Sequence, residues 1–457
     1  MTVAKSYRSA EEIGRTTLGP RPVPELGEQR PAADLASVDT VLPNGLRVLA
    51  VRHASVPTVE LRLRIPFGGT DPLHSARAEV LAETLLTGTT RRDRVAIDTE
   101  LALIGGELGT AVDPERLSVS GSSLAEGLPT LLDVLADVLI DATYPDNEVA
   151  RERERLAERI AVARTQPRVI AREALQRRRY GDHPVVREMP EAEDVATVDP
   201  DAVRALHAAA VLPRGSVLVL VGDLDPEKVV DDVVAAVGGW SSEKETTPLQ
   251  PLPDVQGGDV LLVPRAGAVQ SQIRLSAQAV PRTDERYAAL QLANLVFGGY
   301  FSSRLVENIR EDKGYTYGAH SGFEFTGETA TLDIDADTAS EVTAAALMET
   351  RYELTRLRVV PPSEEEVAAV RQYAVGSLLI STSSQTGLAS QLAALTGAGL
   401  GVDWLTGHPQ RLQQVTTEQV VAAAREFFAP ERFTGVVVGD PDALTDGLAA
   451  LGGVVLP

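Results

Sequence analysis

The sequence predicts an α+β protein made of two similar halves in tandem, each with helices packed on an antiparallel sheet. Segments that match across the chain at a nearly constant offset indicate a duplication. Within each repeat, strand-like segments come first and long helical segments follow, an order typical of helices layered on an antiparallel sheet. Aromatic residues make up only 4% of the 457 residues, which suits closely packed helices rich in Ala, Leu and Val.

Four pairs of segments carry the evidence for the duplication. Gly222-Asp223 recurs as Gly439-Asp440, 217 residues later. A pair of strand-like segments matches at an offset of 212, and a pair of helical segments at an offset of 210. The helical segment around Val149 recurs around Val367, at an offset of 218. Because all four matches keep the same order, we interpret the chain as a tandem duplication.

The elements follow in order along the first half. Residues 1–36 contain four prolines and are expected to form an extended arm. The first half spans 37–240 and opens with a hairpin, marked by the turn sequence Pro43-Asn44-Gly45. A helix, a glycine-rich turn, further strands and long helices then complete this half.

A polar, proline-rich linker at 241–259 separates the halves, since it has no apolar periodicity. The second half, 260–457, repeats the same plan. In it, residues 301–312 are expected to form a helix that ends at Gly314, and the next eleven residues alternate like a strand.

Composition excludes several functions. The chain has no cysteine, which rules out disulfides, thiolate metal sites and a thiol nucleophile. Its formal charge of -22 disfavours nucleic-acid binding and could favour basic peptides. No secretory signal and no apolar run of about 18 residues occurs, so we expect no membrane span and a cytoplasmic location.

The order of motifs resembles the pitrilysin-type zinc peptidases, the inverzincins of family M16, in their bacterial and processing-peptidase branch. The signatures are LPNGLRVLAV, TLLTGTTRR, GGELGTAVDPERL and FGGYFSSRLVENIREDKGYTY, and the resemblance covers about 37–457. It implies two similar halves arranged as a clamshell that encloses a chamber for peptides.

Catalytic members of that family carry H-x-x-E-H on the first helix, with two zinc ligands, a general base and a distant glutamate ligand. The resemblance places these four groups on Glu79, Glu83, Ala82 and Arg159. Alanine cannot accept a proton and a guanidinium cannot bind a cation, so we expect no zinc in this chain. We hypothesise that Arg159 bridges Glu79 and Glu83; the alternative is three separate solvated charges.

Two further features concern substrate binding. The edge strand that holds substrate in catalytic members is altered here, with Gly109 in place of Asn and Val112 in place of Thr. By contrast, the family's Arg and Tyr of the second half are kept as Arg310 and Tyr317. A phenol can stabilise a developing oxyanion, and a guanidinium can grip a substrate carbonyl or carboxylate.

The resemblance therefore implies a non-catalytic subunit of a heterodimeric zinc endopeptidase. This chain would supply Arg310 and Tyr317 in trans to a homologous partner that bears the zinc, and alone it would be inactive. One alternative is a structural or peptide-binding homologue with no role in proteolysis. Another is a self-sufficient homodimer with an unusual metal.

Overall fold

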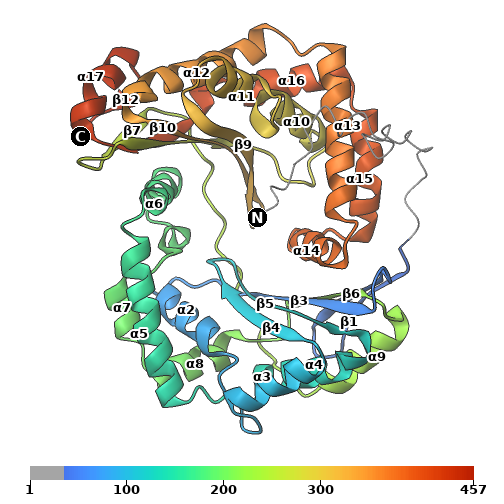
Figure 1. Cartoon of the computed structure of the whole chain (residues 1–457). Helices are drawn as coiled ribbons and strands as arrows, with labels where there is room; N and C mark the ends of the chain where they lie inside the picture. Colours follow the sequence, from blue (N-terminus) through green and yellow to red (C-terminus); the bar gives the residue numbers. More distant parts are fainter. Residues whose placement is uncertain (1–34) are drawn as a thin grey trace, which may run out of the picture. The chain divides into compact units, whose positions relative to one another are not determined.

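The computed structural model describes residues 35–457, so the predicted arm at 1–36 lies outside the described residues except for its last two positions. The described part contains two six-stranded sheets with helices packed against them (Figure 1). The strand order is β1-β2-β6-β3-β5-β4 in the first sheet and β12-β7-β11-β8-β10-β9 in the second. The α+β class with two similar tandem halves is confirmed.

The first sheet and its helices come from the first half of the chain. Its strands are β1 (Ser37–Val41), β2 (Arg47–Arg52), β3 (Thr58–Pro66), β4 (Glu107–Val112), β5 (Arg116–Leu124) and β6 (Val217–Gly222). Its helices are α2 (His74–Thr84), α3 (Arg94–Leu103), η1 (Ala125–Gly127), α4 (Leu128–Ile140), α5 (Asp146–Ala163), α6 (Pro167–Tyr180), η2 (Pro184–Arg187), α7 (Ala192–Ala196), α8 (Pro200–Ala210) and α9 (Pro226–Val237).

The second half repeats these elements in nearly the same order. Its strands are β7 (Val260–Pro264), β8 (Gln270–Gln278), β9 (Thr316–Thr326), β10 (Thr329–Ala339), β11 (Thr434–Gly439) and β12 (Val454–Val455). Its helices are α10 (Tyr287–Asn294), η3 (Leu295–Gly299), α11 (Arg304–Val306), η4 (Glu307–Asp312), η5 (Ser340–Val342), α12 (Thr343–Val359), α13 (Glu364–Ser381), α14 (Gln385–Thr396), α15 (Val402–Gln414), α16 (Thr417–Phe427), η6 (Pro430–Arg432) and α17 (Pro441–Leu451).

Both sheets are mainly antiparallel, with a parallel pair at equivalent places. β1 and β2 form the predicted hairpin, whose turn contains Gly45 at φ 89°. β2 pairs with β6 in parallel, and β7 pairs with β11 in parallel. β6 and β11 are long apolar runs because they are buried on both faces, unlike β3, whose residues alternate between buried and half-buried.

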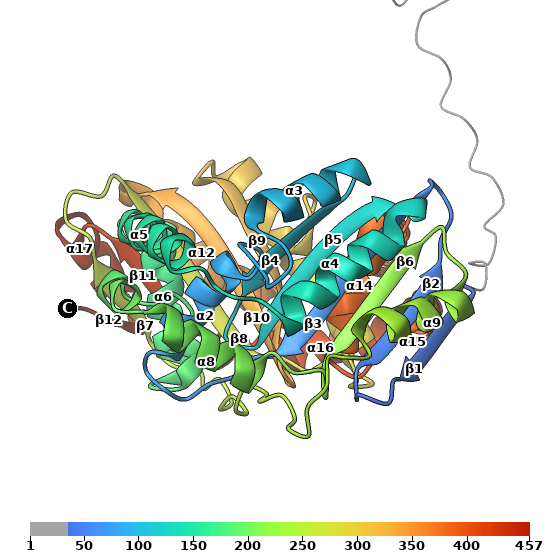
Figure 2. The ribbon, with the colours of Figure 1, turned by 90° about the horizontal axis from the view of Figure 1, so that it is seen from below.

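Each half lends one helix to the sheet of the other half. α6 packs on β11 and β8, where Ala171 and Leu175 contact Val436 and Val438. α14 packs on β6 and β3 of the first sheet, where Leu388, Leu392 and Leu395 join the valines of β2 and β6 in one buried cluster (Figures 1 and 2). α6 and α14 begin 218 residues apart, so they are equivalent members of the duplication.

Polar contacts reinforce this reciprocal exchange of helices. Arg179 of α6 is buried, and its guanidinium binds Glu324 at 2.7 Å and Asp333 at 3.2 Å on the second sheet. At the other exchange, the amide nitrogen of Gln385 donates to the carbonyls of His53 at 2.6 Å and Val56 at 3.0 Å. The buried cation costs desolvation energy, which its two carboxylates offset.

Candidate functional site

The helix α2 carries the position where the resemblance places the zinc motif. Its buried face consists of small and apolar residues, including Val80, Leu81 and Ala82, which pack into the core of the first half. Glu79 and Glu83 lie one helical turn apart and are partly buried. The methyl group of Ala82 offers no proton acceptor at the position of the general base.

Glu83 is held by two arginines of α5. Its Oε1 accepts from Arg159 Nη2 at 2.5 Å, and its Oε2 accepts from Arg155 Nη2 at 3.2 Å. Arg155 also binds Glu152, at 2.6 Å. The pairing of residues 83 and 159 agrees with half of the predicted cluster, since these two positions do meet in the fold.

Glu79 does not join that cluster. Among residues 35–457, no basic nitrogen lies within 4.0 Å of its carboxylate. Burial, reinforced by the charge of Glu83, raises the pKa of Glu79 to about 7, although Arg159 lowers it. A carboxylate without a partner is costly to bury, so the proton is held more tightly than in water.

These residues do not fit a zinc ion. Zinc requires three or four nitrogen, sulfur or carboxylate ligands in tetrahedral arrangement. Here the oxygens of Glu83 are taken by two arginines, one of which is Arg159, the residue at which the resemblance places the distant ligand. Within the part of the chain that the structure describes, no three His, Asp or Glu side chains are grouped to hold a metal.

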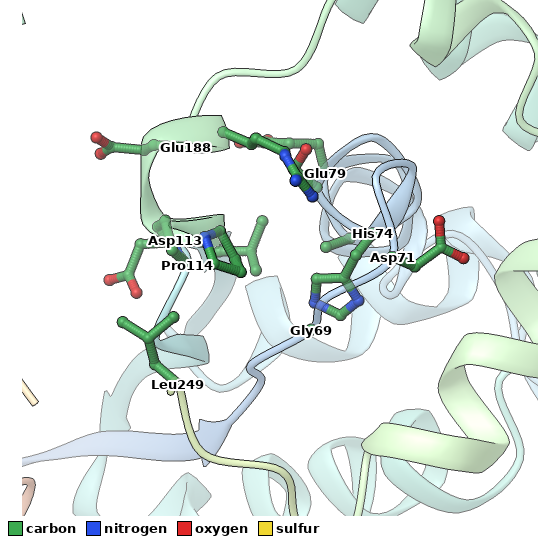
Figure 3. A pocket seen from close by; sticks show the side chains of 13 residues that line it. Gly69, Asp71, His74, Glu79, Asp113, Pro114, Glu188 and Leu249 are labelled. Carbon is green, nitrogen blue, oxygen red and sulfur yellow. The ribbon is translucent and has the colours of Figure 1, made fainter. Parts of the chain in front are cut away.

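Two cavities adjoin Glu79. The smaller, of about 30 Å³, is lined by Gly69, His74 and Asp113 among others, and Figure 3 shows Glu79 projecting from α2 toward the turn that carries Glu188. The larger, of about 410 Å³, lies between α5, α6 and residues 186–190. Glu79, Val112 and Glu188 line both cavities.

The altered strand β4 lies at the edge of the first sheet, as the resemblance implied. It pairs with β5 on one side only, and Gly109 has open space where a side chain would point. Thr110 Oγ1 donates to the carbonyl of Ala82 at 2.5 Å, which ties this edge strand to α2.

Arg310 and Tyr317 lie on separate elements of the second half. Arg310 is in η4, a π-helical turn, and its guanidinium lies 4.7 Å from the centre of the Phe301 ring. Asn308 in the same turn donates to Glu349 at 3.0 Å and Glu353 at 2.7 Å, which fixes η4 to α12. Such turns are common at functional sites.

Tyr317 follows Gly314, whose φ of 65° ends the turn, and it stands near the start of the edge strand β9. Its side chain is 98% exposed. Its hydroxyl has no hydrogen-bond partner among residues 35–457. Tyr317 is thus presented at the surface, whereas Arg310 is half-buried, lies over Phe301 and pairs with Glu311 at 3.5 Å.

Sequence reasoning missed the residues that complete the larger cavity. Gln176 and Arg172 of α6, and Glu188 after η2, line it together with Glu79. They belong to no motif, since a glutamine on an amphipathic helix has no distinguishing pattern. The run RERERLAERIAVAR did signal the abundant arginines of α5, but not which carboxylate each one binds.

The fold, two similar α+β halves in tandem, is that of the zinc peptidase class that the sequence motifs resemble. The chain belongs to peptidase family M16. Residues 49–192 match the family model described as insulinase (peptidase family M16), and residues 197–373 match the model described as peptidase M16 inactive domain.

Relatives and solved structures agree with this assignment. An uncharacterized zinc protease of Mycobacterium tuberculosis is 25% identical over 423 residues, which cover 91% of this chain and 96% of the relative. The uncharacterized zinc protease YmxG of Bacillus subtilis is 24% identical, covering 85% of this chain and 95% of the relative.

Among solved structures, a peptidase M16 inactive domain from Pseudomonas fluorescens has a TM-score of 0.80 at 23% identity, covering 89% of this chain and 98% of that one. The periplasmic protease PqqL from Escherichia coli has a TM-score of 0.75 at 16% identity. That alignment covers 96% of this chain but 48% of PqqL. At these identities the likeness establishes the fold. No helix within residues 35–457 combines the length and apolarity that crossing a membrane requires.

Proposed function

We propose that this chain is the non-catalytic, substrate-binding subunit of a two-chain zinc endopeptidase, located in the cytoplasm. One observation carries the proposal: the positions to which the resemblance assigns the zinc site hold Glu79, Ala82, Glu83 and Arg159, whereas Arg310 is kept half-buried and Tyr317 is kept exposed. An arginine and a tyrosine that face outward can serve a reaction centre that another chain provides. The zinc that the family uses would reside on that homologous partner and would activate water there.

The roles of the two residues follow from their chemistry. Hydrolysis of a peptide bond places negative charge on the former carbonyl oxygen, and the phenol of Tyr317 can donate a hydrogen bond to it. The guanidinium of Arg310 can hold a neighbouring carbonyl in fixed orientation through its planar fork. Its contact with Phe301 and the attachment of η4 to α12 limit the motion of that fork.

The length comparison supports a pair of chains. This chain matches about half of PqqL and nearly all of the shorter relatives. Two chains of this kind would therefore reach the length that PqqL has in one. The overall charge of -22 also favours basic peptides as substrates.

The test is cleavage of a quenched-fluorescent peptide library by this chain, by a zinc-motif homologue from the same organism, and by their mixture, with zinc measured in each. We expect cleavage only in the mixture and zinc only in the homologue. Cleavage or stoichiometric zinc in this chain alone would contradict the proposal. The absence of peptide cleavage by the mixture would favour the alternative, a peptide-binding or structural homologue.

Point variants then test the site. Tyr317→Phe should lower kcat/KM of the mixture about 100-fold, the typical cost of losing one oxyanion donor, and Arg310→Ala should lower it comparably. Tyr352→Phe is the matched control, since this tyrosine of α12 is also exposed, at 54%. Equal activity of the Tyr317→Phe and Tyr352→Phe mixtures would refute the assignment of Tyr317.

A further inference from the structure

A long stretch of the second half carries no charge. The segment from Gln372 to Val402 contains no Asp, Glu, Lys or Arg, although such residues make up 24% of the chain. It covers the second half of α13, all of α14, and the turns that follow each helix. Many of its residues are exposed, and exposed surfaces of soluble proteins normally carry charges of both signs. An uncharged surface of this length indicates contact with something other than water.

The helix α13 has two apolar faces, and only one of them is covered. Val367 and Val370 are buried in the core of the second half. On the other face, Tyr373 and Ile380 lie seven residues apart and point the same way, and Ile380 is 76% exposed. A helix that is apolar on all sides is normally buried on all sides. The second face therefore lacks its partner within residues 35–457.

The exposed face is hollowed at its centre. Gly376 lies between Tyr373 and Ile380 along this face and has open space where a side chain would point. The two larger residues are about 10 Å apart along the helix axis, since each residue adds about 1.5 Å. One leucine-sized side chain fits between them, over the glycine.

Aromatic rings connect this face to Arg310. The ring of Tyr373 lies 5.0 Å from the ring of Tyr300. The next residue, Phe301, is exposed, and its ring lies 4.7 Å from the guanidinium of Arg310. The uncharged face and the arginine proposed to hold substrate are thus parts of one surface.

The same segment also lines a cavity between the two halves. Ala394 and residues 397–399, at the end of α14, form one wall of a cavity of about 690 Å³. Arg64 of the first half and Phe325 of the second half form other parts of its wall. A cavity of this size admits a segment of peptide but no folded domain. This position favours a peptide over a partner subunit as the occupant.

We propose that the uncharged face of α13 binds the peptide substrate, with an apolar side chain over Gly376 and the peptide backbone passing Phe301 toward Arg310. The proposal rests on the proposed function, because Arg310 gives the direction of the reaction centre. Burial of apolar surface against Tyr373 and Ile380 favours binding. A charged side chain at this place would lose its hydration without gaining a partner. The chain would thereby select peptides that carry an apolar residue.

The experiment is fluorescence anisotropy of a labelled, end-capped nonapeptide, in which leucine alternates with glutamine, titrated with the full chain. A peptide with serine in place of leucine is the matched probe, since both peptides are uncharged. We expect the leucine peptide to bind at least tenfold more tightly. Equal binding of the two peptides, or no binding, would overturn the proposal. Neither zinc nor a partner subunit is needed, so this outcome is distinct from that of the cleavage test.

Variants locate the site. Gly376→Leu fills the hollow and should weaken the leucine peptide at least tenfold, and α13 stays folded because leucine favours helix more than glycine does. Ile380→Ser should weaken it severalfold. Val95→Ser is the matched control, since this valine of α3 in the first half is 71% exposed and should leave binding unchanged. Unchanged binding in Gly376→Leu, or equal loss in Ile380→Ser and Val95→Ser, would refute the site.

Sedimentation velocity tests the other occupants of this face. We expect the parent chain and Ile380→Ser to sediment alike, both alone and mixed with the zinc-motif homologue. Self-association of the parent that Ile380→Ser abolishes would assign the face to a second copy of this chain. Loss of the complex with the homologue in Ile380→Ser would assign the face to the partner subunit. Either result would overturn the peptide site.

Discussion

Replacing Glu79 by Gln should stabilise the protein, and more so as the pH rises. The pKa of this carboxyl is raised by burial from its ordinary 4.5 to about 7, so the folded state holds the proton more tightly than the unfolded state. Stability contributed by the protonated carboxyl is therefore lost as the pH rises from the unfolded to the folded pKa. The Glu79→Gln variant has no proton to release at this position, so its free energy of unfolding does not fall with rising pH for this reason.

The magnitude follows from the two pKa values. A difference of about 2.5 units at about 1.4 kcal/mol each gives up to about 3 kcal/mol at pH 8. At pH 5.5 the same linkage gives only about 1–2 kcal/mol, because the folded state still keeps most of the proton. The gain should thus roughly double between these two conditions.

Urea denaturation of both proteins at pH 5.5, 6.5 and 8 measures this gain, read from midpoints at unchanged m values. Glu158→Gln removes the same charge from an exposed position and should stay within about 0.5 kcal/mol of the parent at every pH. A gain that does not change with pH, or a loss of stability at pH 8, would refute the reasoning. A gain that does not change with pH would mean that folding does not raise the pKa of Glu79, and a loss at pH 8 would mean that the ionised carboxylate is stabilised in the folded protein.

Three further predictions concern stability and metal. Arg179→Met should cost about 3–5 kcal/mol in urea denaturation, since Glu324 and Asp333 lose their buried cation. Arg168→Met, whose side chain is 80% exposed, should cost under about 0.5 kcal/mol, and equal costs would contradict the distinction. Arg159→Ala should cost less than about 1 kcal/mol, because its side chain is 52% exposed and Arg155 still binds Glu83; a larger loss would mean that it neutralises both carboxylates. EDTA should leave the melting temperature of the isolated chain unchanged, whereas a drop of several degrees would reveal a structural metal.

The duplication could be predicted from the sequence because short matching segments are enough to show it. The Gly-Asp pairs at 222 and 439 end equivalent strands, β6 and β11, that are buried on both faces. Those uninterrupted apolar runs could also have indicated a second covering layer. No local pattern indicates that the helix covering each sheet comes from the other half of the chain, since the apolar face of α6 would suit either sheet.

The candidate site, too, could be predicted from the sequence only in part. Counting from Glu83 placed Arg159 opposite it, and the two side chains meet in the fold at 2.5 Å. Sequence spacing could not predict that Glu79 lacks a basic partner. This depends on how the side chains pack, with Arg155, one turn before Arg159 on α5, binding the second oxygen of Glu83. The cavity depended on packing of α5 against α6 and on the path of residues 186–190, which spacing does not encode.

The reciprocal exchange of helices has a consequence for the history of the chain. A single half would leave one sheet face bare and one helix with nothing to cover. Two copies of such a half would satisfy each other by the same exchange, as a two-fold symmetric, domain-swapped dimer. Joining the two copies through the segment 241–259 would preserve these contacts and would allow the sequence of each half to diverge. In the fused chain, α14 begins at Gln385, which donates to the first half, whereas α6 begins at Pro167, which has no side-chain donor.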